Sequence, residues 1–191
     1  MLIGGKVRLR KVEREDLCFL FDLLNDTGLQ NYDVSMHAAI SRYALDRDFE
    51  KLFHRQGWER FLITSHDGQD KYGIISVKEI KGVPNCYTLS IALTTRNTGC
   101  GYGSEAIQLL LGFMFRNRAA VRIGLEVRSY NTRAIHCFAG CGFIREGTLR
   151  QASFHDGAYC DVLVMSILRT EFMEKQQGKS QGQDSSSQHK C

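Results

Sequence analysis

Three glycines at alternate positions, Gly99, Gly101 and Gly103, lie between a short apolar run and a long one. Because glycine adopts backbone conformations closed to other residues, such a segment turns tightly and brings its N–H groups close to an anion. Residues 87–93 are typical of a strand, and residues 104–117 of a helix whose N-terminus adds positive potential. A strand, a glycine-rich turn and a helix in this order favour a phosphate-binding site.

Two common phosphate-binding motifs do not fit this turn. The dinucleotide pattern GxGxxG and the nucleoside-triphosphate pattern GxxxxGK[ST] both require glycine where this chain has Ser104. Close packing between strand and helix would also explain a glycine-rich turn. The turn alone therefore leaves both interpretations open.

The rest of the chain predicts a fold of the mixed α/β (α+β) class. Alternating or helical spacing of apolar residues predicts strands at 6–11, 60–65, 72–80, 87–93, 121–128, 143–148 and 158–168, and helices at 14–24, 38–54, 104–117 and 131–139. Asn131 is expected to cap the last helix. Residues 1–173 should form one domain, and the polar residues 174–191 a disordered tail.

Composition excludes several classes of protein. The 25 Lys and Arg exceed the 21 Asp and Glu by a net charge of only +4 and form no basic cluster, which argues against nucleic acid. No apolar run approaches the roughly 20 residues that span a bilayer, and no signal peptide precedes the first strand, so we expect a cytoplasmic protein away from membranes. The seven cysteines form no CxxC pair. We expect reduced thiols and no metal site.

Several spacings occur together and resemble one family. Arg96-x-x-Gly99-x-Gly101 matches the signature [QR]-x-x-G-x-[GA], and NTRAIHCFAGCGFIREGTLR and HDGAYCDVLVMSI follow at 131–150 and 155–167. Together they resemble the GCN5-related N-acetyltransferase (GNAT) superfamily. The nearest branch contains the ribosomal-protein alanine and spermidine acetyltransferases.

The resemblance implies a central, mostly antiparallel, twisted sheet flanked by helices, whose fourth and fifth strands, 87–93 and 121–128, splay apart. It also implies acetyl-CoA as co-substrate. The backbone near Ile91 and Leu93 would pair with the pantetheine arm, and Asn131 would contact the arm near the thioester. The implied cofactor-binding residues of the turn and the following helices are Arg96, Thr98, Gly99, Cys100, Gly101, Tyr102, Gly103, Ser104 and Phe138.

The implied reaction is direct attack of a primary amine on the acetyl thioester. The acceptor would be a protein N-terminus, a polyamine or an amine-bearing small molecule. Asp26, Asp33, Asp46 and Asp48 could attract a basic acceptor. The resembling branch also makes a homodimer a possible assembly.

An amine is mostly protonated near neutral pH, so a base or a bound water must remove a proton. Glu79 is the candidate base, and Tyr87 or Ser90 could hold a water. Many family members place a tyrosine acid seven residues after the motif asparagine, where this chain has Phe138, which donates no proton. That departure keeps a second hypothesis open, a non-catalytic acyl-CoA-binding regulatory module.

Overall fold

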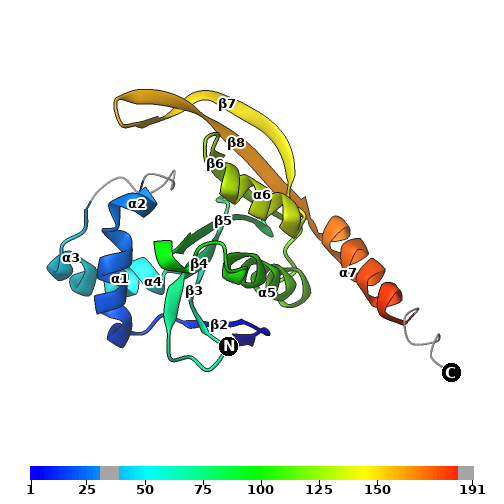
Figure 1. Cartoon of the computed structure of the whole chain (residues 1–191), viewed down its shortest axis with the longest axis horizontal. Helices are drawn as coiled ribbons and strands as arrows, with labels where there is room; N and C mark the ends of the chain where they lie inside the picture. The colour runs from blue at the N-terminus through cyan, green and yellow to red at the C-terminus, as the bar shows by residue number, and fades with distance from the viewer. Residues whose placement is uncertain (31–38, 185–191) are drawn as a thin grey trace.

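The structure is a computed structural model that describes residues 1–30 and 39–184. They form an eight-stranded sheet of order β1-β2-β3-β4-β5-β6-β8-β7 with helices on both faces (Figure 1). β5 and β6 pair in parallel, and the other neighbouring strands are antiparallel. The predicted class and the mostly antiparallel sheet are confirmed.

The strands are β1 Leu2–Ile3, β2 Val7–Lys11, β3 Trp58–Ser65, β4 Lys71–Glu79, β5 Cys86–Leu93, β6 Arg122–Arg128, β7 Ile144–His155 and β8 Ala158–Leu168. The α-helices are α1 Leu17–Leu24, α2 Thr27–Gln30, α3 Arg42–Arg47, α4 Phe49–Phe53, α5 Tyr102–Asn117, α6 Thr132–Cys141 and α7 Arg169–Asp184. Two short 3₁₀ helices, η1 Arg14–Asp16 and η2 Thr95–Asn97, precede α1 and the glycine turn. Of the described helices, none is long and apolar enough to span a membrane.

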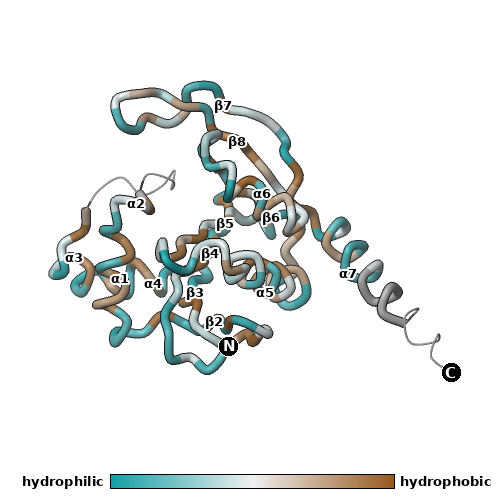
Figure 2. The backbone as a smooth tube through the Cα atoms, in the orientation of Figure 1, coloured by the Kyte–Doolittle hydropathy of each residue, from teal (hydrophilic) through white to brown (hydrophobic). Residues whose placement is uncertain are grey.

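Two apolar clusters hold helices against the two faces of the sheet. Leu110 of α5 belongs to the larger cluster, and Leu45 of α3 to the smaller one. The adjacent residues Leu62 and Ile63 of β3 fall into different clusters, because successive side chains of a strand point to opposite faces. Figure 2 shows the hydropathy of each residue along the backbone, with hydrophobic segments in the sheet and in the helices that pack on it.

β5 and β6 separate within the sheet. Residues 86–88 pair with residues 122–124, and beyond them β5 continues along β4 while β6 continues along β8. The predicted splay of the strands at 87–93 and 121–128 is therefore confirmed. It opens a gap in the sheet beyond the parallel pairing of β5 with β6.

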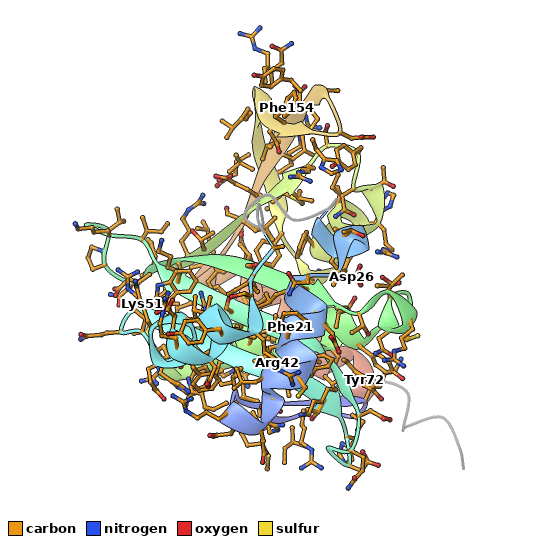
Figure 3. All side chains as sticks on the ribbon, turned by 90° about the vertical axis from the view of Figure 1, so that its left-hand side faces the viewer. Phe21, Asp26, Arg42, Lys51, Tyr72 and Phe154 are labelled. Atoms are coloured by element: carbon orange, nitrogen blue, oxygen red, sulfur yellow. The ribbon has the colours of Figure 1, made fainter. Side chains whose placement is uncertain are left out.

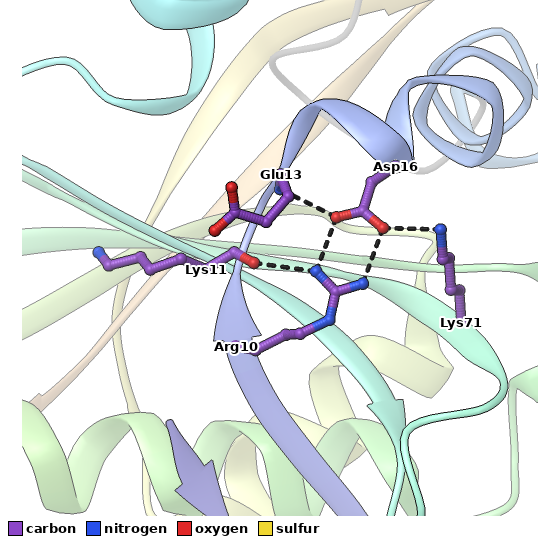
Figure 4. Close-up of polar contacts among 5 residues, drawn as sticks. All are labelled: Arg10, Lys11, Glu13, Asp16 and Lys71. Atoms are coloured by element: carbon purple, nitrogen blue, oxygen red, sulfur yellow. Dashed lines mark hydrogen bonds and ion pairs between the residues drawn. The ribbon is translucent and has the colours of Figure 1, made fainter.

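One carboxylate, that of Asp16, is fully buried (0% exposed) at the end of η1. Arg10 donates to both of its oxygens at 2.7 and 2.8 Å, Lys71 Nζ lies 2.7 Å from Oδ1, and the Glu13 N–H donates to Oδ2 at 2.9 Å (Figure 4). Burial favours the neutral acid, but the donors outweigh it and lower the pKa of Asp16 to about 2. The cluster fastens the start of α1 to β2 and to the start of β4.

The N-terminal half differs in detail from the sequence prediction. Residues 38–54, expected as one helix, form α3 and α4, which separate at Asp48; residue 38 lies outside the described part of the chain. Ser41 caps α3 by accepting a hydrogen bond from the Ala44 N–H at 3.1 Å. The additional strand β1 pairs with β2 and was too short to show a pattern.

The C-terminal third is more regular than predicted. β7 was expected at 143–148 but continues to His155, because bulges at 145–147 and 149–153 keep it paired with β8. The hairpin reaches away from the helices that cover the sheet and carries Phe154 near its tip (Figure 3).

The expectation of a disordered tail from residue 174 is wrong as far as Asp184, because α7 includes these residues. Phe172 anchors the helix by packing on Phe115, with ring centroids 5.2 Å apart. Lys175 donates to the carbonyl of Gly140 at 3.2 Å. Residues 185–191 lie outside the described part of the chain.

Candidate active site

A cavity of about 580 Å³ occupies the gap between β5 and β6. Ser90 and Ile91 line it from β5, and Glu126 and Val127 line it from β6. Its other walls are the glycine turn, the start of α5, and α6. The splay thus creates a space between the two strands that a ligand could occupy.

The cavity joins the two faces of the sheet. Ile91 and Val127 point toward the α5 and α6 side, where they belong to the larger apolar cluster. By strand alternation their neighbours Ser90 and Glu126 point to the opposite face. Leu29 of α2 lines the cavity as well. One ligand can therefore enter along α5 and α6 and meet a second one arriving from the α1 and α2 side.

The glycine turn has the backbone that its sequence predicts. Gly99 and Gly101 have φ of +82° and +83°, and Gly101 is the N-cap of α5. Gly103 is needed for a different reason, because a Cβ there would lie 3.1 Å from Leu93 Cδ1. The turn can therefore present its N–H groups while α5 packs closely on β5.

Most of the predicted cofactor residues surround the cavity. Those that line it are Ile91, Leu93, Thr98, Gly99, Gly101, Gly103, Ser104, Asn131 and Phe138. Arg96, Cys100 and Tyr102 are not among the described lining residues. Arg96 is exposed on η2, and Tyr102 stacks on Tyr72 with ring centroids 4.4 Å apart.

α6 brings two of the predicted residues to the cavity wall. Asn131 caps the helix as expected, because its Oδ1 accepts a hydrogen bond from the Ala134 N–H at 3.2 Å. Phe138 is buried and packs edge-on against Phe143, with ring centroids 5.8 Å apart. It contributes apolar surface at the position where many members of the resembling family have a tyrosine acid.

The candidate base, Glu79, and Tyr87, which was expected to hold a water, lie elsewhere. Glu79 and Tyr87 face each other across β4 and β5, at the end where β5 is still paired with β6. Neither is among the described residues that line the cavity. Partial burial, and after it the Glu79 carboxylate, raises the pKa of Tyr87. The geometry does not bring these residues to the gap.

Sequence reasoning missed one carboxylate at the cavity. Glu126 is exposed and supplies the only carboxylate among the described lining residues. The available signal was its place between Leu125 and Val127, a charged residue within an apolar strand that borders the splay. A carboxylate there can accept a proton from a ligand arriving from the α1 and α2 side.

Two further lining residues, Cys137 and Arg133, were not among the predicted site residues. Cys137 Sγ lies 3.3 Å from Ser104 Oγ, and hydrogen bonds with Cys141 and Ser104 lower the pKa of the Cys137 thiol. Arg133 donates to Thr98 Oγ1 at 2.9 Å, which places a cation beside the turn.

Asp33, one of the carboxylates expected to attract a basic acceptor, lies outside the described residues. Within residues 1–30 and 39–184, no three His, Cys, Asp or Glu side chains gather as metal ligands would.

Known proteins share this architecture. The sequence model of the acetyltransferase (GNAT) domain matches residues 6–144. The chain is 27% identical over 173 residues to a spermidine N(1)-acetyltransferase of Vibrio cholerae, covering 91% of this chain and 99% of the relative. It is 29% identical over 112 residues to the ribosomal-protein-serine acetyltransferase of Escherichia coli K12, covering 58% and 62% of the two chains.

A solved structure adds a ligand-bound comparison. The spermidine N-acetyltransferase of Vibrio cholerae in complex with CoA and spermine superposes with a TM-score of 0.82 at 26% identity. The match covers 89% of this chain and 99% of that one. The whole architecture is therefore shared with an enzyme whose structure contains a cofactor and an amine.

Proposed function

Because this chain belongs to the acetyltransferase (GNAT) domain family, with residues 6–144 matched, we propose that acetyl-CoA occupies the β5–β6 cavity and that a polyamine is the acceptor. The chain is an acetyl-CoA-dependent N-acetyltransferase that acts on an amine. The observation that supports this position for acetyl-CoA is the cavity itself, because the glycine turn and residues from both faces of the sheet line it.

The residues present fit an extended thioester cofactor. Residues 98–104 and the N-terminus of α5 suit a pyrophosphate, because their N–H groups and the helix dipole both favour an anion. The edge of β5 beyond residue 88 can pair with the amides of a pantetheine arm, as Ile91 and Leu93 are proposed to do. Asn131 would position the arm near its thioester end. When bound, acetyl-CoA supplies the activated acetyl group.

We assign proton acceptance to Glu126 rather than to Glu79. The Glu126 carboxylate lines the cavity and, by strand alternation, lies on the face of the sheet opposite α5 and α6. A protonated amine that approaches on that face can transfer its proton to the Glu126 carboxylate. The amine must lose this proton before it can attack as a nucleophile. Ser90 lies on the same face of β5 and can hold a water or the amine itself.

The polyamine proposal draws on the relatives and on charge. The spermidine acetyltransferase of Vibrio cholerae matches over nearly its whole length, and a spermidine N-acetyltransferase of that organism was solved with spermine. Asp26, directly before α2, accepts hydrogen bonds from the N–H groups of Gly28 and of the lining residue Leu29. Glu126 and Asp26 are the two carboxylates that we propose for binding a polycation.

The acceptor is tested with a panel of amines. We expect release of free CoA thiol to be fastest with spermidine or spermine, and much slower with peptides that begin with serine or alanine. A peptide as the best acceptor would contradict the polyamine assignment and favour a protein N-terminus. CoA binding without turnover on any amine would favour the non-catalytic module instead.

The glycine turn gives a second test. Gly101→Ala is expected to weaken CoA binding roughly tenfold, because φ of +83° is strained for alanine and the new Cβ would lie 3.2 Å from Lys6 Nζ. Gly82→Ala is the matched control: φ is also +83°, but Gly82 belongs to the turn after β4. It should destabilise the fold similarly and leave CoA affinity unchanged, as calorimetry and thermal unfolding will measure. Equal CoA affinities of the two variants would contradict this role of the turn.

Four expectations remain proposals. They are a single acetyltransferase domain within residues 1–173, a cytoplasmic location away from membranes and nucleic acid, a homodimer, and catalysis without a metal.

A further inference from the structure

Lys6, just before β2, reaches the glycine turn. Its Nζ lies 3.4 Å from the carbonyl oxygen of Cys100 and 3.2 Å from the place where a Cβ of residue 101 would be. We propose that Lys6 is a further cofactor-binding residue, which supplies a cation to the pyrophosphate of acetyl-CoA. This inference rests on the proposed position of the cofactor at the turn.

A carboxylate of α5 fixes the position of Lys6. Glu105 accepts three consecutive backbone N–H groups, from Gly5 at 2.6 Å, Lys6 at 2.8 Å and Val7 at 3.1 Å. Glu105 lies in the first turn of α5, directly after the glycine turn. These hydrogen bonds hold the backbone of residues 5–7 at a fixed position relative to the glycine turn. Glu105 therefore acts as a positioning residue for Lys6.

The ammonium group has capacity for a ligand. Lys6 is exposed, so little of its hydration is lost before a phosphate arrives. Its contact with the Cys100 carbonyl is long at 3.4 Å, and an ammonium carries three donors. A phosphate oxygen is a stronger, charged acceptor than a carbonyl. Turning from Cys100 toward an anion on the turn therefore strengthens the interaction of Lys6.

The surrounding charges favour the same ligand. Arg133 reaches the turn from the cavity side through Thr98, so cations flank the turn at two different points. The nearby carboxylate of Glu105 is compensated by the three N–H groups that it accepts. A pyrophosphate is negative on both phosphates and can be shared between the two cations.

The test measures the binding of three ligands by calorimetry: CoA, 3′-dephospho-CoA and pantetheine. Lys6→Gln is expected to raise the Kd of CoA and of dephospho-CoA by the same factor, roughly five- to tenfold, and to leave that of pantetheine unchanged. Lys6→Arg keeps the charge and should remain within about twofold of the original protein. Lys81→Gln, at an exposed position in the β4–β5 turn, removes the same charge and should change none of the three values.

Three outcomes would overturn the assignment. Equal losses for pantetheine would mean that Lys6 only stabilises the turn. A loss for CoA without one for dephospho-CoA would place Lys6 at the 3′-phosphate instead. Equal effects of Lys6→Gln and Lys81→Gln would mean that net charge alone is responsible. Because binding is measured, a protein that binds CoA but acetylates no amine would refute the proposed function and still test Lys6.

Discussion

Glu126→Gln is expected to lower kcat for acetyl transfer by about 10²- to 10⁴-fold while CoA affinity stays within about twofold. The amide keeps the size of the side chain at the cavity but cannot accept the proton of an arriving ammonium group. The cofactor contacts proposed for the turn and for β5 are unaffected. Steady-state kinetics with spermidine, together with CoA binding, will measure the two quantities separately.

Glu79→Gln is the matched control for this prediction, because it makes the same chemical change at a carboxylate outside the cavity lining. We expect its kcat to stay within about threefold of the original value. At high pH the free amine needs no protein base, so the deficit of Glu126→Gln should narrow as pH rises. A larger loss for Glu79→Gln than for Glu126→Gln would return the role to the residue that the sequence favoured.

The sequence predicted what short-range patterns determine. Most strands and helices have clear apolar periodicity, and the turn at 99–103 contains glycine where φ is positive or where α5 approaches β5. Asn131 was identified as a cap because capping depends on residues only a few positions apart. The splay of β5 and β6 was expected from the family resemblance rather than from periodicity.

The residues that sequence reasoning missed depend on contacts between distant segments. Glu79 was predicted as the base and Glu126 was not, but β5 leaves β6 beyond residue 88, so that Glu126 lines the cavity and Glu79 does not. Lys6 meets the turn because Glu105 holds its backbone, a pairing of segments about 100 positions apart. The part of α7 beyond residue 173 was expected to be a tail because its sequence is polar, and the aromatic anchor of the helix, Phe172, lies before it.

The buried carboxylate gives the largest expected effect on stability. Asp16→Asn should lower the free energy of unfolding at pH 7 by about 2–3 kcal/mol, because one amide cannot satisfy both Arg10 and Lys71. This loss is smaller than the roughly 3–5 kcal/mol for a fully buried pair, because the Arg10 and Lys71 side chains are 25% and 29% exposed and keep some hydration. Urea unfolding at fixed pH will measure the difference.

The pH dependence separates this charge effect from a packing defect. The pKa of Asp16 is about 2 in the folded chain and near 4 in an unfolded one, so its contribution is complete above about pH 4 and is lost as pH falls through about 2. The shift corresponds to about 2 kcal/mol. The gap between Asp16→Asn and the original protein should therefore shrink over that interval.

Asp46→Asn makes the same change in an exposed pair. Asp46 lies 2.6 Å from Arg14, and both side chains are more than half exposed, so solvent screens their attraction. We expect a loss below about 0.5 kcal/mol at pH 7. Equal losses for Asp16→Asn and Asp46→Asn, or a gap for Asp16→Asn that persists at pH 2, would show that Asp16 stabilises α1 by shape rather than by charge. The contrast tests burial, because in each pair a carboxylate meets an arginine at about the same distance.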